Sequence, residues 1–380
     1  MLRLDKSTLY ASLPLLFGLI LGVGFLNSFY KAIDPNENLG EIALGPENTF
    51  TLASNAEKQV HCEGGLIQIK VCIDAYLNYG KDNNLILWLG NSQLHSINQI
   101  KTGDETASST LHRQLASQKK YLLTISHANA NLQEHFLLFE YLSQTISVNT
   151  LILPIVFDDL RETGVRSSLL DILDNKLILS DLEKTEYGNT ILTRQKNKKS
   201  IESTSDALNE TRQEGVEEYL NAVLESILNI WGDRALLRGN ILNNLYKFRN
   251  WSLDITPTSI RKVIPGRYFL NMKALNEIIE SAKRKEIKVL IYIAPIRNDV
   301  KIPYDLDDYD VFKSEVMSLG NDNFIKVVNF EDIIPPNYWG TKKSTSINDD
   351  EELDFMHFKS EAHKILSDTI FKEIKVENDL

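Results

Sequence analysis

Three residues of this sequence have the types and spacing needed for covalent acyl chemistry, although they lie at opposite ends of the chain. Ser92 follows Gly90 directly after a strongly apolar run, and glycine permits a tight turn at that point. Asp354 and His357 stand three residues apart, shortly before the last helical segment. A serine hydroxyl becomes a good nucleophile when a histidine takes its proton and an aspartate orients the imidazole. The backbone N–H of Ser92, at the start of a helix, would face the oxyanion that forms on the attacked carbonyl.

Each of these three residues also has a structural alternative. Serines after strands are often N-caps of the following helix, so Ser92 can have that role instead. Asp354 can also cap a helix, and His357 can be an ordinary surface residue. For the catalytic interpretation, we expect Asp354 and His357 to share a loop that brings both side chains to the rim occupied by Ser92.

The elements that would position these residues are predicted from hydrophobic periodicity. Continuous apolar runs predict strands buried on both faces, as in a parallel sheet, and amphipathic segments between them predict helices. The alternation of strand and helix is typical of a flavodoxin-like three-layer α/β sandwich, which binds ligands at the carboxyl ends of its strands. The predicted strands are 85–89, 121–125, 151–157, 288–293 and 324–329, and the predicted helices are 111–118, 131–144, 272–286 and about 359–375.

A long segment, about 160–275, interrupts this alternation. Its polar first part has the composition of exposed or mobile chain, and its second part has apolar residues at helical spacing. We interpret the segment as a helical insertion. It has three possible roles, which are to cap the site, to dock a partner or simply to pack on the domain.

The two candidate motifs together resemble those of the SGNH (GDSL-like) hydrolase superfamily. The resemblance is carried by Gly90-Asn91-Ser92 after the first strand and by Asp354-Phe355-Met356-His357-Phe358 before the final helix. Ala294-Pro295 also resembles the family's post-strand proline segment. The resemblance covers about 85–375 without the insertion. It implies that Ser92 is the nucleophile and that Asp354 and His357 complete a catalytic triad.

The sequence departs from the family pattern at the oxyanion donors. The family usually has a glycine after its second strand and a Gly-x-Asn after its third. Here the second strand leads into 126–131, and the third leads into Asp158 and Asp159, with no Gly-x-Asn. Asn129 or Asn131 is a candidate side-chain donor, although turn or N-cap roles suit both residues equally.

Other polar residues near the predicted strand ends also have two interpretations. His95, one helical turn after Ser92, is either close to the site or a partly exposed helix residue. Asp158, Asp159 and Arg161 either bind a polar substrate or form a local ion pair. Tyr338 and Trp339 are either a sugar-stacking wall or part of the core.

The N-terminus predicts a membrane anchor. Ser7–Tyr30 contains no charged residue and is long enough, as a helix, to cross a hydrocarbon core of about 30 Å. A cleaved signal peptide is the alternative, but the run is longer than usual and ends in a poor cleavage site. Arg3 and Lys6 precede the run, which favours a cytoplasmic tip and an exported remainder. The expected organisation is a tip and anchor at 1–30, a juxtamembrane linker and lead-in at 31–80, and an SGNH-like domain at 81–380.

Charge and composition limit the ligands and partners that the protein is expected to bind. A formal net charge of -11 argues against nucleic-acid binding, which needs a basic face. His357 and His363 lack a third ligand at metal-binding spacing, so we expect neither a metal nor another cofactor. The only cysteines, Cys62 and Cys72, either form a structural disulfide outside the cytoplasm or remain free thiols.

One anchor followed by an exported SGNH-like domain resembles the accessory proteins of cell-envelope acylation, such as the D-alanyl transfer protein and the alginate O-acetylation proteins. This narrower resemblance implies a multispanning membrane-bound O-acyltransferase partner, an acyl-serine intermediate, and a sugar or polyol hydroxyl as acceptor. Two hypotheses follow from the sequence. One is a serine esterase or O-acyltransferase at the outer face of a membrane, and the other is a non-catalytic binding or scaffold subunit with the same fold.

Overall fold

The centre of the protein is a parallel sheet of six strands in the order β10-β9-β8-β5-β7-β4. The computed structural model describes residues 48–50, 54–55, 58–185, 187–193, 245, 247–320, 324–342, 344, 346 and 351–376. The strands are β4 (His61–Cys62), β5 (Asn84–Gly90), β7 (Lys120–Ser126), β8 (Val148–Ile155), β9 (Lys288–Ile293) and β10 (Ile325–Asn329). The predicted α/β fold with a parallel sheet is therefore confirmed, and all five predicted strands are present.

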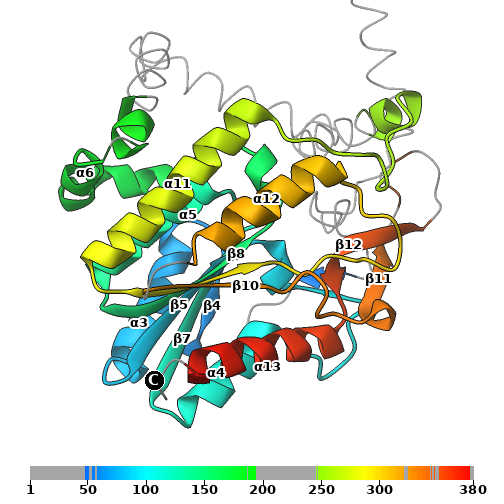
Figure 1. Ribbon diagram of the computed structural model, residues 1–380. Coiled ribbons are helices and arrows are strands. Elements are labelled where there is room, and N and C mark those ends of the chain that lie inside the picture. The colour runs from blue at the N-terminus through cyan, green and yellow to red at the C-terminus, as the bar shows by residue number, and fades with distance from the viewer. Residues whose placement is uncertain are drawn as a thin grey trace, which may run out of the picture.

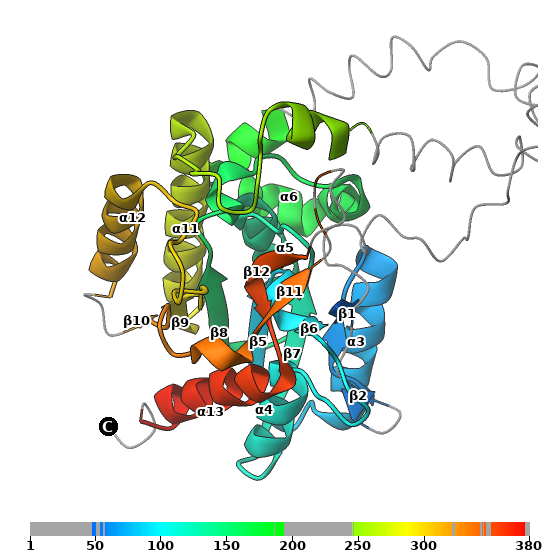
Figure 2. The same cartoon turned by 90° about the vertical axis from the view of Figure 1, so that its right-hand side faces the viewer.

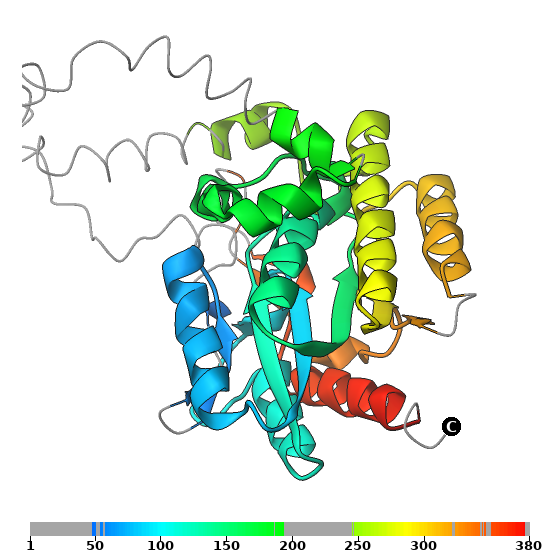
Figure 3. The same cartoon turned by 90° about the vertical axis from the view of Figure 1, so that its left-hand side faces the viewer.

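Helices cover both faces of the sheet and complete the three layers (Figure 1). In Figure 3 the blue α3 is at one end of the first layer and the orange α12 is at the other. The first layer contains α3 (Leu66–Tyr79), α5 (Leu132–Thr145), α11 (Pro265–Arg284) and α12 (Leu306–Ser318), and the second contains α4 (Ala107–Ala116) and α13 (Ser360–Val376).

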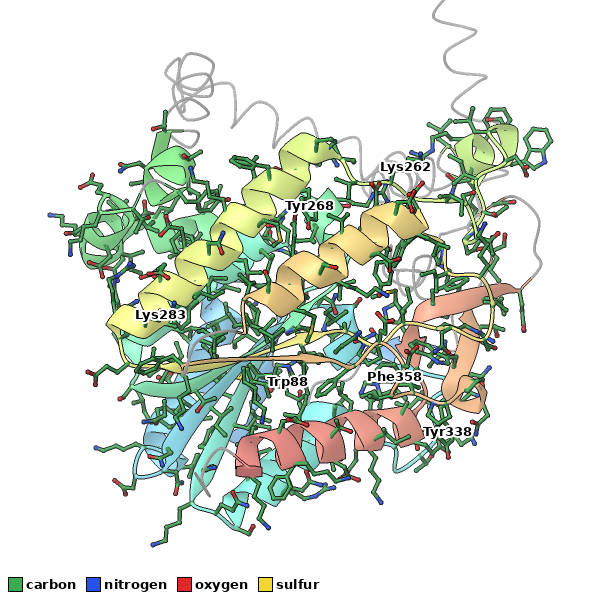
Figure 4. All side chains as sticks on the ribbon, viewed as in Figure 1. Trp88, Lys262, Tyr268, Lys283, Tyr338 and Phe358 are labelled. Carbon is green, nitrogen blue, oxygen red and sulfur yellow. A yellow bond between two sulfur atoms is a disulfide. The ribbon has the colours of Figure 1, made fainter. Side chains whose placement is uncertain are left out.

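The central strand β5 is apolar at successive positions because both of its faces are buried. Leu85, Leu87 and Leu89 pack into the core under the first helical layer, whereas Ile86 and Trp88 pack into the core under α13 and α4. Figure 4 shows Trp88 and Phe358 in the space between the sheet and α13. Burial on both faces fixes β5 firmly, so the turn that follows it has a rigid support.

The segment before β5 is part of the sheet domain. β4 pairs in parallel with β7 and adds a sixth strand that the sequence did not predict. Cys62 in β4 and Cys72 in α3 form a disulfide with their Cα atoms 6.1 Å apart. This result decides between the two alternatives that the sequence left open.

A second, smaller sheet brings the C-terminal motif to the carboxyl edge. β11 (Trp339–Lys342) and β12 (Glu352–Phe358) pair in antiparallel fashion, and β12 lies beside β6 (Ser96–Asn98), as Figure 2 shows. Asp354 and His357 therefore lie in a strand, and the prediction of a loop was wrong. The sequence did not predict strand β12, because a polar stretch separates it from β11, the strand with which it pairs.

Two predicted regions lie partly or wholly outside the described residues. The predicted anchor at 1–30 is outside them, and none of the helices within them is long and apolar enough to cross a membrane. Of the predicted insertion, residues 194–244 are likewise outside. Its described part contains η2 (Asp159–Arg161), η3 (Ser167–Asp174), α6 (Lys176–Leu182) and the start of α11, which begins at Pro265 because proline suits the first turn of a helix.

Candidate active site

Ser92 is held in a tight turn at the carboxyl end of the central strand. β5 ends at Gly90, where a Cβ would collide with the side chain of Leu94. Asn91 is the N-cap of the short helix η1 (Ser92–Leu94), and its side-chain oxygen accepts a hydrogen bond from the backbone N–H of Gln93 at 3.0 Å. Asn91 is therefore the N-cap, and Ser92 is the first residue of the helix. The backbone N–H of Ser92 consequently has no hydrogen-bond acceptor within the helix. Ser92 is partly exposed.

The structure brings Ser92, His357 and Asp354 into one chain of hydrogen bonds. His357 Nε2 lies 2.9 Å from Ser92 Oγ, and His357 Nδ1 lies 3.0 Å from Asp354 Oδ2. An ionised carboxylate only accepts hydrogen bonds, so Nδ1 carries the proton and Nε2 is the acceptor. Asp354 is 2% exposed and His357 is 8% exposed. This arrangement can take the serine proton at Nε2 and stabilise the resulting imidazolium through Asp354.

Hydrogen bonds keep the Asp354 carboxylate oriented. Its Oδ1 accepts from the backbone N–H groups of Met356 and His357, both at 3.0 Å. Its Oδ2 accepts from Asn98 Nδ2 at 3.2 Å in addition to His357. Burial alone would raise the pKa of Asp354, but the charge of His357, the hydrogen bonds from His357 and the charge of Lys342 outweigh it and lower the pKa to about 2. Asp354 therefore remains ionised at any pH at which the imidazole can act as a base.

Gln93 connects the serine turn to the histidine strand. Its Nε2 donates to the backbone oxygens of Pro295 and Met356, both at 2.9 Å. Pro295, in the segment after β9 that resembles the family's post-strand proline segment, therefore holds η1 against that segment, and Met356 holds η1 against β12. Gln93 itself was missed, because a single glutamine carries no signal in the sequence.

A second serine–histidine arrangement lies buried behind the first. The hydroxyl of Ser126, at the end of β7, is hydrogen bonded to Nε2 of His61 at 2.6 Å and to Nδ1 of His95 at 2.7 Å. All three side chains are fully buried. Burial and neighbouring histidines lower the pKa of His61 to about 3 and that of His95 well below its ordinary value. His95 is therefore neither catalytic nor partly exposed, and both imidazoles are neutral near pH 7.

No family model and no curated protein matches the chain. The parallel-sheet α/β fold is compatible with an SGNH or flavodoxin-like domain.

The predicted oxyanion candidates have different surroundings. Asn131 is the N-cap of α5, forming a capping box with Glu134, which identifies its role as structural. Asn129 is exposed, has a positive φ of 53°, and lines a pocket at the carboxyl edge of the sheet. At the end of β8, where the family has Gly-x-Asn, Asp159 Oδ2 accepts from Asn91 Nδ2 at 2.6 Å. Burial raises the pKa of Asp159 well above its ordinary value, opposed by the bond from Asn91.

The pocket that Asn129 lines has a volume of about 570 Å³ and is bordered mainly by polar side chains from four parts of the chain. They come from the ends of β7 and β8, from 249–261 and from β11. Asp158 forms an ion pair with Arg161, as the sequence suggested, and a second one with Arg261.

The remaining candidates are structural. His363 is buried, where its Nδ1 accepts from the N–H of Ala107 and its Nε2 donates to the oxygen of Ser96. Among the described residues, no group of His, Cys, Asp or Glu side chains is arranged to hold a metal ion. Trp339 is 3% exposed and packs edge-on against Phe358, so it belongs to the core, with Tyr338 partly buried beside it.

Proposed function

We propose that this chain is an SGNH-type serine esterase or O-acyltransferase that acts outside the cytoplasm on a sugar or polyol of the cell envelope. The observation that carries the proposal is the hydrogen-bonded chain Ser92–His357–Asp354 at the carboxyl edge of a parallel sheet. Its serine is accessible, its histidine has a free acceptor nitrogen for the hydroxyl proton, and its carboxylate is buried and ionised. These are the roles that nucleophilic acyl chemistry requires.

In the proposed reaction, Ser92 Oγ attacks the carbonyl carbon of an acyl donor while His357 Nε2 takes the hydroxyl proton. The backbone N–H of Ser92 donates to the oxyanion that forms. The bond to the leaving group breaks, and the leaving group departs with the proton from His357. A hydroxyl of water or of the acceptor then attacks the acyl-serine, gives its proton to His357, and releases Ser92 with its proton restored.

Anchoring and export belong to the same proposal. The apolar run Ser7–Tyr30 supports a single membrane span with the main domain outside the cytoplasm. The Cys62–Cys72 disulfide supports that side of the membrane, because disulfides persist in oxidising compartments. A multispanning O-acyltransferase is the proposed partner and source of the acyl group.

One observation favours the alternative, a non-catalytic scaffold or binding subunit. No Gly-x-Asn follows the third predicted strand, which leads into Asp158 and Asp159, and the carboxylate of Asp159 accepts a hydrogen bond from Asn91, the residue next to Ser92. The oxyanion would then have the backbone N–H of Ser92 as its donor without the family's asparagine.

Labelling with a fluorophosphonate probe tests the proposal. We expect the wild-type protein and Ser126→Ala to be labelled, and Ser92→Ala and His357→Ala not to be. Ser126→Ala is the matched control, because it removes the other serine hydroxyl that is bonded to imidazole. If the wild type stays unlabelled, or Ser92→Ala is labelled equally, the nucleophilic role of Ser92 is wrong and the scaffold function stands.

A further inference from the structure

Exposed apolar side chains are concentrated on the segment that leads into α11. Among the described residues, seven of the fifteen large apolar side chains that are exposed lie within 245–269. The most accessible near the start of this segment are Phe248, Trp251 and Leu253, which are 52%, 53% and 64% exposed. Single apolar side chains on a surface are ordinary, but a cluster of them marks a site of interaction.

The segment presents its aromatic side chains on one side of a short helix, 247–252. Phe248 and Trp251 are three residues apart on this helix, and the centroids of their rings lie 5.7 Å from each other. Asn250 lies between them in sequence and is buried, and its backbone oxygen accepts from the N–H of Ile255 at 2.8 Å. The helix is therefore held to the domain on the side of Asn250, and the two rings are left exposed.

The same segment is basic, although the whole chain is acidic. The chain has a formal net charge of -11, whereas 245–269 contains five basic residues and one acidic residue, Asp254. Figure 4 shows Lys262 near the first turn of α12, where its Nζ lies 3.3 Å from Asp305. Aromatic and aliphatic side chains flanked by lysine and arginine are typical of segments that lie in the interface of an anionic bilayer.

The chain enters the domain from the predicted anchor at the same edge of the sheet. β1 (Asn48–Phe50) pairs with β6, which contacts η1 and β12 at the carboxyl edge (Figure 2). Residues 249–261 border the pocket at that edge. The predicted linker, 31–47, reaches at most about 60 Å even when fully extended. A linker that enters here keeps the carboxyl edge nearer to the bilayer than the amino edge.

We infer that the 245–269 segment docks on the surface of an anionic bilayer, with Phe248, Trp251 and Leu253 inserted among the lipid headgroups. The basic side chains of the segment lie at the lipid phosphates. The inference rests on the membrane anchoring that belongs to the proposed function. A tethered domain meets the bilayer at a high effective concentration, so weak docking is sufficient. With two attachments, the carboxyl edge that carries Ser92 is turned towards the membrane.

Quenching by nitroxide lipids measures this docking in the full chain. A single fluorophore is attached through Phe248→Cys or through Tyr79→Cys, since both native cysteines are closed in a disulfide. Tyr79 is the matched control, because it is also 52% exposed but ends α3 at the opposite edge of the sheet, shortly before β5. The proteins are reconstituted in phosphatidylcholine–phosphatidylglycerol vesicles with and without nitroxide on the upper part of the acyl chain.

We expect the nitroxide lipid to remove most of the emission at position 248 and none at position 79, because interfacial segments insert about 5–10 Å into the boundary of headgroups and acyl chains. Vesicles of phosphatidylcholine alone should give weaker quenching at position 248, because they do not attract the basic side chains. Equal quenching at the two positions, or quenching at neither, overturns the docking. Energy transfer between two copies labelled at position 248, without lipid quenching, would assign the segment to self-association instead.

Removing the aromatic side chains should release the segment while the anchor still holds the chain. A fluorophore on Leu253→Cys is the reporter. Adding Phe248→Ser and Trp251→Ser should abolish its quenching. Adding Tyr79→Ser and Phe324→Ser, which remove two exposed aromatic side chains at the opposite edge, should leave it unchanged. Quenching that survives the loss of Phe248 and Trp251 overturns the inference.

Flotation of the full chain with the vesicles and fluorophosphonate labelling of the wild type are read separately. Flotation without quenching at position 248 overturns the docking and leaves the anchor in place. A chain that does not float overturns the anchoring and, with it, the docking. Quenching at position 248 without fluorophosphonate labelling supports the docking and overturns the proposed chemistry of Ser92. Labelling without quenching leaves that chemistry in place and overturns the docking.

Discussion

Two serines at neighbouring strand ends are hydrogen bonded to imidazoles, and only one has the surroundings of a nucleophile. Ser92 follows β5 and lies 2.9 Å from His357, while Ser126 ends β7 and lies 2.6 and 2.7 Å from His61 and His95. The shorter distances belong to the serine that we assign to structure. Distance between hydroxyl and imidazole is therefore a poor guide to reactivity in this protein.

The difference lies in charge and access. Ser92 is partly exposed, whereas Ser126 is fully buried. His357 has the carboxylate of Asp354 behind it, whereas the charges that act on His61 and His95 are those of other histidines. An imidazolium formed beside Ser92 is stabilised, and one formed beside Ser126 is both desolvated and repelled. The buried arrangement can hold two strands and a turn together, but it cannot take a proton at neutral pH.

The largest effect should follow from removing the carboxylate. Asp354→Asn keeps the shape but favours the wrong tautomer of His357, so we expect fluorophosphonate labelling of Ser92 to slow by about 10³–10⁴-fold. Rates are measured by quenched labelling at pH 7. The control is the far-UV spectrum and melting temperature of the variant, which should show a folded protein. A loss of less than tenfold would contradict the assignment of Asp354.

The two arrangements should also differ in their response to acid. The pKa of His61 in the folded protein is about 3, below the ordinary 6.5, so the unfolded chain takes up this proton first. Stability present above pH 6.5 is then lost as the pH falls towards 3, by about 1.4 kcal/mol per pH unit for such a group. The pKa of Asp354 is lowered from 3.8 to about 2, so its contribution is lost only between about pH 4 and 2.

Urea unfolding between pH 7 and pH 5 measures this difference. We expect His61→Gln to flatten the decline of the free energy of unfolding with falling pH, by about 1 kcal/mol per pH unit in the lower part of that range. Asp354→Asn should leave the slope unchanged in the same range. His135, His363 and His95 also have lowered pKa values, so a residual slope remains in both variants. Identical slopes for wild type and His61→Gln would show that His61 is protonated in the folded state.

Removing the hydroxyl of Ser126 should lower stability with little effect on the nucleophile. Ser126→Ala leaves buried nitrogens of His61 and His95 without this partner, which costs about 1–3 kcal/mol of unfolding free energy. Chemical denaturation gives this value, and the labelling rate of Ser92 in the same protein should remain within about threefold of wild type, under 1 kcal/mol. Loss of labelling at unchanged stability would reverse the roles of the two serines.

The sequence predicted the accessible arrangement and missed the buried one for a physical reason. Strands such as 85–89 are local apolar runs, and Ser92 follows one of them directly. Asp354 and His357 were connected to it through the resemblance of both motifs to one family. No local pattern marks His61, Ser126 and His95, because β4 is two residues long and reaches Ser126 only through pairing with β7.

Contacts between distant segments also explain the other differences between the predicted and the observed structure. The sequence assigned Asp354 and His357 to a loop, because strand β12 depends on pairing with β11 across a polar stretch. The Cys62–Cys72 disulfide was left open, since it needs α3 to fold back against β4. Gln93 and Asn98 support the triad by donating hydrogen bonds to backbone oxygens and to the Asp354 carboxylate, all far along the chain. The sequence did not indicate either residue, because a single amide side chain forms no recognisable motif.

The smallest effect should come from Asn98, which supports the triad from β6. Its Nδ2 donates to Asp354 Oδ2 at 3.2 Å and to the oxygen of Thr341 at 3.1 Å, and a Cβ at Gly340 would collide with this amide. Asn98→Ala removes one of the hydrogen bonds to a carboxylate that keeps three others, so we expect labelling of Ser92 to slow by about tenfold or less. Asn98→Asp adds a negative charge beside Asp354, which should move the pH profile of labelling to higher pH, and labelling rates across the pH range measure that change. Since an alanine at this position cannot shift the profile by charge, a shift in Asn98→Asp alone identifies Asn98 as a positioning residue of the triad. Equal profiles in both variants would reduce it to a structural contact between β6 and β11.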